Sequence, residues 1–287
     1  MYAFHTLRAH GPQETFALED FALFAMLLSA LEWRRHNGRV KLVTDSVGIE
    51  YLDMCGLLDA WDETEVLLDE MKSLGIDENV FWAGAKLYAL SRQETPCVMM
   101  DLDFIAWQPM DFSAYGRDLA VIHREDICQS IYPSKEAFRF RDGWQLPVWL
   151  DWSARPCNAA FAYFGSQRFL REYTAFALRF MQMVDTFDDR LRYMVFAEQR
   201  WMAMCAAHLA IPVHEISTLE GLFGGTQKYF THIWGHKQRL RDHPREAEAF
   251  CRKCAGRLRH DFPAFAAELE SRPWAAKYFK KQADRGE

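Results

Sequence analysis

The chain has 287 residues, half of them hydrophobic, which is enough to bury the core of one large domain. Its 34 basic and 40 acidic side chains give a net charge of -6, which argues against broad electrostatic capture of nucleic acid. Seven scattered cysteines, an odd number, indicate a reducing compartment, and we expect neither a signal peptide nor a membrane span. The expected location is cytoplasmic, with peripheral contact at the inner face of a membrane left open.

Strands and helices alternate along most of the chain. The hydrophobic pattern predicts strands at 2–7, 40–45, 64–68, 96–100, 119–123, 159–164 and 212–216, and helices at 14–37, 46–58, 80–92, 166–184 and 191–209. This order predicts an α/β fold with a parallel, helix-covered sheet, in which ligands bind beyond the carboxyl ends of the strands. Residues 241–287 have a helical pattern, and we expect them to form a C-terminal extension of the domain made by residues 1–240.

Two aspartates mark the end of one predicted strand. Asp101 and Asp103 follow the apolar run 96–100, with Leu102 between them. Carboxylates at this spacing suit a hard cation such as Mg²⁺ or Mn²⁺, which takes oxygen ligands and keeps positions open for phosphate oxygens. One aspartate capping a turn beside a solvated neighbour is the alternative that needs no metal.

A phosphatase of the haloacid dehalogenase type uses the same local pattern. In that class the first aspartate, here Asp101, is the phosphoryl acceptor. Ile105 stands where that motif has threonine or valine, and no later lysine is followed by a G-D-x-x-x-D cluster. The phosphatase is therefore the second hypothesis.

Further segments accompany the aspartates in a fixed order: Ala85 to Leu90, Cys97 to Ile105, Cys157 to Phe164, Ala197 to Met202 and Thr231 to Lys237. In this order they resemble the retaining glycosyltransferases of A-type fold that include glycogenin and the bacterial lipopolysaccharide galactosyl- and glucosyltransferases. The resemblance spans residues 85–237. It implies a Rossmann-like mixed sheet flanked by helices that binds a nucleotide diphosphate sugar.

The resemblance also implies roles for individual residues. Asp101, Asp103 and His232 would hold Mn²⁺ or Mg²⁺, with His236 as the competing ligand, while Gly235 would let the backbone approach a phosphate. Lys86 and Lys237 would meet the diphosphate of a donor, expected to be UDP-linked. The residues expected at the reacting sugar are Asn158, Glu198 and Gln199.

An aromatic loop at 139–155 is the candidate acceptor site. It carries indole rings beside a carboxylate, a combination that can stack on a sugar and bind its hydroxyls: Trp144, Trp149, Asp151 and Trp152. Packing of these rings onto the core is the alternative.

The expected activity is therefore metal-dependent hexosyl transfer to a hydroxyl of a saccharide or glycolipid acceptor, in synthesis of a polysaccharide, lipopolysaccharide or glycoconjugate. Retention of configuration is implied by the resemblance alone. A sugar-nucleotide-binding protein of the same fold without turnover is the non-enzymatic alternative.

Overall fold

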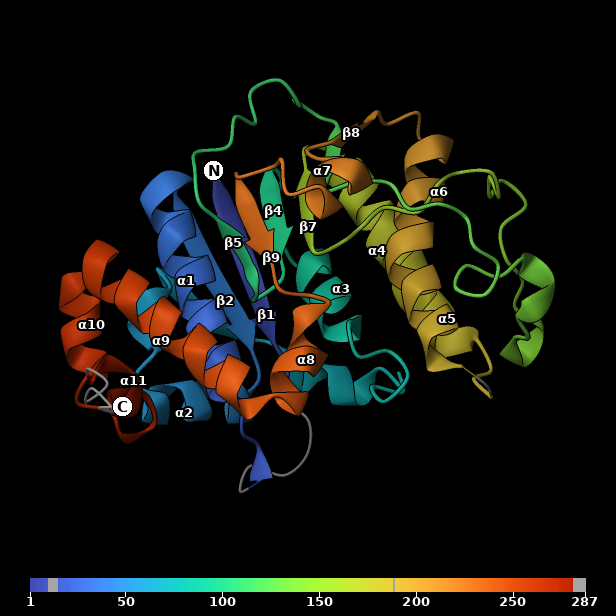
Figure 1. The fold of residues 1–287 in the computed structure, drawn as a ribbon. Helices are drawn as coiled ribbons and strands as arrows, with labels where there is room; N and C mark the ends of the chain where they lie inside the picture. Colours follow the sequence, from blue (N-terminus) through green and yellow to red (C-terminus); the bar gives the residue numbers. More distant parts are fainter. Residues whose placement is uncertain (10–14, 188, 281–287) are drawn as a thin grey trace.

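A seven-stranded mixed sheet forms the centre of the molecule (Figure 1). The computed structural model describes residues 1–9, 15–187 and 189–280. The strand order is β3-β2-β1-β4-β7-β6-β8, with a separate two-stranded sheet of β5 and β9. The strands are β1 (Tyr2–Leu7), β2 (Arg39–Thr44), β3 (Glu63–Val66), β4 (Cys97–Met100), β5 (Phe104–Ala106), β6 (Leu119–Val121), β7 (Phe161–Phe164), β8 (Val213–Glu215) and β9 (Phe230–His232).

The sheet is parallel except at one strand. β7 runs antiparallel to both of its neighbours, β4 and β6. The parallel sheet expected from the order of elements is therefore wrong at β7, whereas the mixed sheet that the resemblance implies is confirmed. The connection from β6 to β7 contains short 3₁₀ turns at Lys135–Ala137 and Arg141–Gly143 and no crossover helix. A connection that returns at the same edge of a sheet produces an antiparallel pair. The long loop between β6 and β7 therefore remains at the edge where β4 ends.

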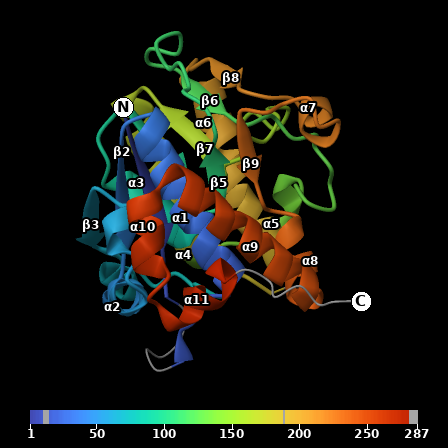
Figure 2. The same cartoon turned by 60° about the vertical axis from the view of Figure 1, so that its left-hand side comes forward.

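Helices cover both faces of the sheet (Figures 1 and 2). Successive residues of β1 and β4 point to opposite sides, as in Ala3 against Phe4 and Val98 against Met99, and they enter two separate cores. The helices are α1 (Asp20–His36), α2 (Ser46–Cys55), α3 (Gly84–Ser91), α4 (Gln167–Met183), α5 (Arg190–Val195), α6 (Trp201–His208), α7 (Leu219–Phe223), α8 (His236–Asp242), α9 (Pro244–Asp261), α10 (Pro263–Leu269) and α11 (Pro273–Phe279). One core contains α3, α4 and α6, and the other contains α1, the β5–β9 pair and α9 to α11.

The C-terminal helices pack against α1 and α2. Tyr278 donates to an oxygen of Asp20 at 2.6 Å, and the Trp274 indole donates to the carbonyl of Cys55 at 3.1 Å. The helical pattern expected after residue 240 is thus present. No helix in the described part of the chain is both long enough and apolar enough to traverse a bilayer.

Several predicted helices have different limits. α1 begins at Asp20 rather than at residue 14, and residues 10–14 lie outside those described. α3 begins at Gly84 because Asp77 caps a separate turn, accepting from the backbone N–H of Asn79 and from that of Val80. The predicted helix 191–209 contains a π-helical turn at Phe196–Arg200. The three-residue strands β5 and β9 were not among the predicted strands.

His5, a buried residue of β1, forms hydrogen bonds with side chains of other core segments. The indole N–H of Trp61 donates to His5 Nδ1 at 3.0 Å, and His5 Nε2 lies 3.0 Å from the Ser29 hydroxyl, which donates to the Phe104 carbonyl. Protonation of Nδ1 would therefore bring two N–H groups against each other. Burial lowers the pKa of His5 to about 3, with the charge of Asp101 acting in the opposite direction.

This histidine should make stability depend on pH. Because the folded pKa lies below the ordinary value of 6.5, the unfolded chain takes up the proton first, so the stabilisation is complete above about pH 6.5 and is lost as the pH falls toward 3. The free energy of unfolding should fall by a few kcal/mol over this range, since a tenfold change in proton affinity corresponds to about 1.4 kcal/mol. Urea unfolding at pH 7, 5.5 and 4.5 should show a shallower pH dependence for His5→Gln than for wild type. Parallel curves for the two proteins would contradict this assignment.

Candidate metal and donor site

The aspartate pair lies where β4 gives way to β5. The Asp101 N–H donates to the Ala160 carbonyl, and the Asp101 carbonyl accepts from the N–H of Phe104, closing a tight turn. β5 then pairs antiparallel with β9, with Phe104 opposite His232. Pairing of two strands distant in sequence thus places an imidazole beside both carboxylates.

Three side chains present ligand atoms to one another. His232 Nε2 lies 3.7 Å from Asp101 Oδ2 and 3.8 Å from Asp103 Oδ2, and the candidate ligand atoms all lie within 4.8 Å of one another. Asp103 Oδ2 is buried and has no hydrogen-bond partner among the described residues. A buried carboxylate oxygen without a donor is costly unless a cation satisfies it, so the set fits a divalent metal.

Two lysines bind the other oxygens of the same carboxylates. Lys86 Nζ lies 2.6 Å from Asp101 Oδ1, and Lys237 Nζ lies 3.0 Å from Asp103 Oδ1. Lys86 also contacts Glu198 Oε1 at 2.6 Å and donates to the Ala159 carbonyl at 3.1 Å. Each aspartate therefore gives one oxygen to a lysine and turns the other toward His232.

The protonation states agree with a metal site. Burial raises the pKa of Asp101, but Lys86 and His232 outweigh burial and bring it below its ordinary value. Burial lowers the pKa of His232 despite the two carboxylates beside it. Burial also raises the pKa of Glu198, against the effect of Lys86. An ionised aspartate and a neutral imidazole are the forms that coordinate a divalent cation.

These side chains line one cleft of about 740 Å³. The structure brings together in it most of the residues that the sequence singled out: Lys86, Asp101, Asp103, Asn158, Glu198, Gln199, His232 and Lys237. Gly235 and His236 are exposed at the start of α8 and do not line the cleft, and the three-residue cluster contains His232 rather than His236. The volume suits a ligand of drug size or larger.

The π-helical turn between α5 and α6 supplies Glu198 and Gln199. Gln199 Oε1 accepts from the Tyr132 hydroxyl at 2.5 Å, and the Gln199 carbonyl accepts from the N–H of Cys157 at 3.2 Å. Single π turns of this kind occur frequently at functional sites. The turn connects Glu198, which pairs with Lys86, to the long loop between β6 and β7, which carries Tyr132.

The loop tryptophans lie elsewhere. Trp149 stacks on His208 with ring centroids 4.1 Å apart, Trp152 stacks on Phe196, and Trp144 packs edge-on against Phe140. Trp144, Trp149, Asp151 and Trp152 are not among the residues that line the cleft. In this structure the indoles pack against the aromatic core.

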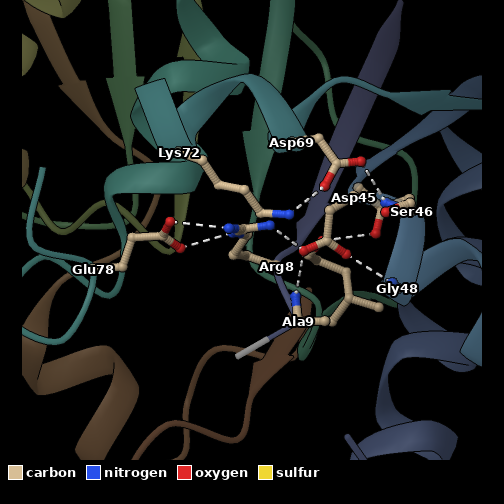
Figure 3. A network of polar contacts seen from close by, with 10 residues as sticks. Arg8, Ala9, Asp45, Ser46, Gly48, Asp69, Lys72 and Glu78 are labelled. Atoms are coloured by element: carbon tan, nitrogen blue, oxygen red, sulfur yellow. Dashed lines mark hydrogen bonds and ion pairs between the residues drawn. The ribbon is translucent and has the colours of Figure 1, made fainter. Parts of the chain in front are cut away.

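An ionic network adjoins the cleft at Arg8, which directly follows β1 (Figure 3). Arg8 lines the cleft, donates to both oxygens of Glu78 and pairs with Asp45. Asp45 also accepts from the N–H groups of Ala9 and Gly48. The network joins the end of β1 to the start of α2 and to the turn before α3, the helix that carries Lys86.

Sequence reasoning missed other residues of the cleft. Glu125, Tyr132 and Trp82 line it, and none was singled out from the pattern. Glu125 could have been found, because it follows a predicted strand just as Asp101 does. Trp82 and Tyr132 lie in connections whose course only the folded chain determines.

The model of one protein family, described as a family of unknown function (DUF6734), matches residues 12–269. The chain belongs to this family. No curated protein matches it.

Solved structures with similarity to the chain include three whose titles name glycosyltransferases. The PaToxG glycosyltransferase covers 97 % of this chain and 86 % of its own, with 12 % identity and a TM-score of 0.42. The match to mouse xyloside xylosyltransferase 1 in its apo form covers 75 % of this chain and 84 % of that protein, with 11 % identity and a TM-score of 0.40. The match to the galactosyltransferase LgtC with donor and acceptor sugar analogues covers 80 % of this chain and 79 % of that protein, with 8 % identity and a TM-score of 0.38. With TM-scores below 0.5, these likenesses carry no conclusion about what this chain does.

Proposed function

We propose that this member of the family is a metal-dependent glycosyltransferase that moves a sugar from a nucleoside diphosphate sugar, UDP-linked, to an acceptor hydroxyl. The observation that carries the proposal is the pair of carboxylate oxygens, Asp101 Oδ2 and Asp103 Oδ2, that face His232 Nε2 within one cleft. A hard cation with open positions is what a departing diphosphate requires.

Asp101, Asp103 and His232 would hold Mn²⁺ or Mg²⁺, and the bound cation would neutralise the charge that grows on the diphosphate. Lys237, whose side chain is 39 % exposed beside Asp103, would bind a phosphate oxygen. Lys86, held more firmly between Asp101 and Glu198, orients both carboxylates.

Asn158, Glu198 and Gln199, which line the same cleft, would hold the transferred sugar. Asn158 stands just before β7, where its Oδ1 accepts from the N–H of Ala160. We further propose retention of configuration, with the departing phosphate taking the proton of the acceptor hydroxyl, and a role in polysaccharide or glycoconjugate synthesis.

Thermal-shift measurements with nucleotide sugars, with and without Mn²⁺, test this function. UDP-sugars should raise the melting temperature of wild type only when Mn²⁺ is present, because ligand binding to the folded state alone stabilises it. His232→Ala should remove most of this increase, whereas His236→Ala should retain it. No stabilisation by any nucleotide sugar, or stabilisation that ignores Mn²⁺, would contradict the proposal.

A further inference from the structure

A carboxylate outside the metal cluster stands in the same cleft. Glu125 follows β6, and its side chain is 26 % exposed where it lines the cleft. Its Oε1 lies 2.8 Å from His123 Nε2 and accepts from Asn158 Nδ2 at 3.3 Å. The hydrogen bond from His123 lowers the pKa of Glu125 most, and the one from Asn158 adds to this effect. Together they outweigh burial, which raises the pKa. Glu125 is therefore an ionised acceptor of hydrogen bonds at neutral pH.

His123 fixes the direction of this carboxylate. It is 5 % exposed, behind the wall of the cleft, and its Nδ1 is buried without a hydrogen-bond partner among the described residues. Since a carboxylate can only accept, Nε2 must carry the proton that the pair shares. The contacts from His123 and Asn158 both fall on Oε1, so Oε2 takes part in neither.

A hydrogen-bond donor lies nearby. The Tyr132 hydroxyl, on a residue that is 6 % exposed, donates to the oxygen of the Gln199 amide, so the amide nitrogen is the remaining donor. A hydrogen bond from Gln199 also reaches Glu198, which leaves one of the two amide N–H groups for a ligand. Glu125, Tyr132, Glu198 and Gln199 all line this cleft. Burial, together with the charges of Glu125 and Glu198, raises the pKa of Tyr132. A hydroxyl group both donates and accepts, so a carboxylate and an amide N–H₂ in one cleft suit it.

The charge of this wall limits what can bind. The basic side chains that line the cleft are Arg8, Lys86 and Lys237, and each is already paired with a carboxylate. Beside Glu125, Asp126 adds a second carboxylate, which Arg155 meets at 3.4 Å. An acceptor with a carboxylate or phosphate near its reacting hydroxyl would meet like charge here.

We propose that Glu125 binds the acceptor, that this acceptor is a neutral polyhydroxyl compound such as an uncharged sugar, and that His123 is the positioning residue for Glu125. The inference rests on the proposed function, because it names the substrate class of the same cleft. It also predicts saccharide binding that does not require turnover.

Saturation-transfer NMR with methyl glucoside, methyl galactoside and methyl glucuronoside, in the presence of Mg²⁺ and UDP, tests the assignment. Wild type should bind the two neutral glycosides and show little signal from the uronate. Glu125→Gln should weaken neutral glycoside binding about tenfold, as expected for the loss of a charged hydrogen bond. Glu136→Gln, an exposed glutamate of the same loop outside the cleft, is the matched control and should bind as wild type does.

Equal binding of the uronate, normal binding by Glu125→Gln, or no glycoside binding by wild type would overturn the proposal. The Mn²⁺-dependent stabilisation by UDP-sugars should persist in Glu125→Gln, and its loss would place Glu125 on the donor side instead. Failure of the proposed donor function has a different result: UDP-sugars would not raise the melting temperature of wild type, while binding of the glycosides would still be measured.

The role of His123 has its own measurement. His123→Gln places an amide N–H₂ where Nε2 stands and should keep glycoside binding as in wild type. His123→Phe removes that donor and should weaken glycoside binding. Both variants should keep the UDP-sugar stabilisation. If His123→Phe binds glycosides normally, or if both variants lose donor and glycoside binding together, His123 does not position Glu125.

Discussion

Replacing Asp103 by asparagine should reduce metal-dependent turnover of the donor about 100-fold or more. The substitution preserves the size of the side chain but removes an anionic oxygen that faces His232, and metal stabilisation of a leaving group contributes several kcal/mol. Hydrolysis of UDP-sugars without acceptor, followed by release of UDP over a range of Mn²⁺ concentrations, measures the loss.

The fold should survive this substitution. Asp103 Oδ2 is buried and has no donor in the described part of the chain, so the neutral amide removes charge repulsion from Asp101. Asp111→Asn, which changes an exposed carboxylate outside the cleft, is the control. Full activity in Asp103→Asn, or a similar loss in Asp111→Asn, would contradict the role given to Asp103.

Lys86→Met should be the most destabilising single change in the cleft. It removes the cation between Asp101 and Glu198 and leaves two carboxylates close together. Removal of one partner from a buried ion pair costs about 3–5 kcal/mol, and we expect roughly 2–4 kcal/mol because Asp101 is 29 % exposed. Urea unfolding at pH 7 provides the measurement.

A double variant separates lost packing from lost charge. Lys86→Met with Glu198→Gln should recover part of the stability, because one of the two unpaired charges is then absent. The deficit of Lys86→Met should also shrink as the pH falls, since burial already raises the pKa of Glu198 and its carboxyl takes up a proton readily. Additive effects and a deficit independent of pH would show that Lys86 acts through packing alone.

The α/β fold was predictable because the inner strands of its sheet are short apolar runs that alternate with helical segments. β1, β2, β4 and α4 appear within one or two residues of the limits that hydrophobic periodicity predicts. The direction of β7 was not predictable, because periodicity is the same in parallel and antiparallel strands. It depends on where the loop from β6 returns to the sheet.

The candidate site divides in the same way. Asp101 and Asp103 are prominent in sequence because they end an apolar strand, and Lys86 and His232 were singled out through the order of motifs. In the folded chain, one oxygen of each aspartate contacts a lysine and the other faces His232. The sequence alone does not show this arrangement. The burial of His123 behind Glu125 likewise depends on the fold rather than on local pattern.

A metal-binding measurement tests the central claim most directly: crystals soaked with Mn²⁺ and UDP, with anomalous diffraction used to locate the metal. We predict one Mn²⁺ bonded to Asp101 Oδ2, Asp103 Oδ2 and His232 Nε2 and to phosphate oxygens of UDP. An absence of anomalous signal at these residues, or Mn²⁺ bound elsewhere while UDP occupies the cleft without it, would contradict the account.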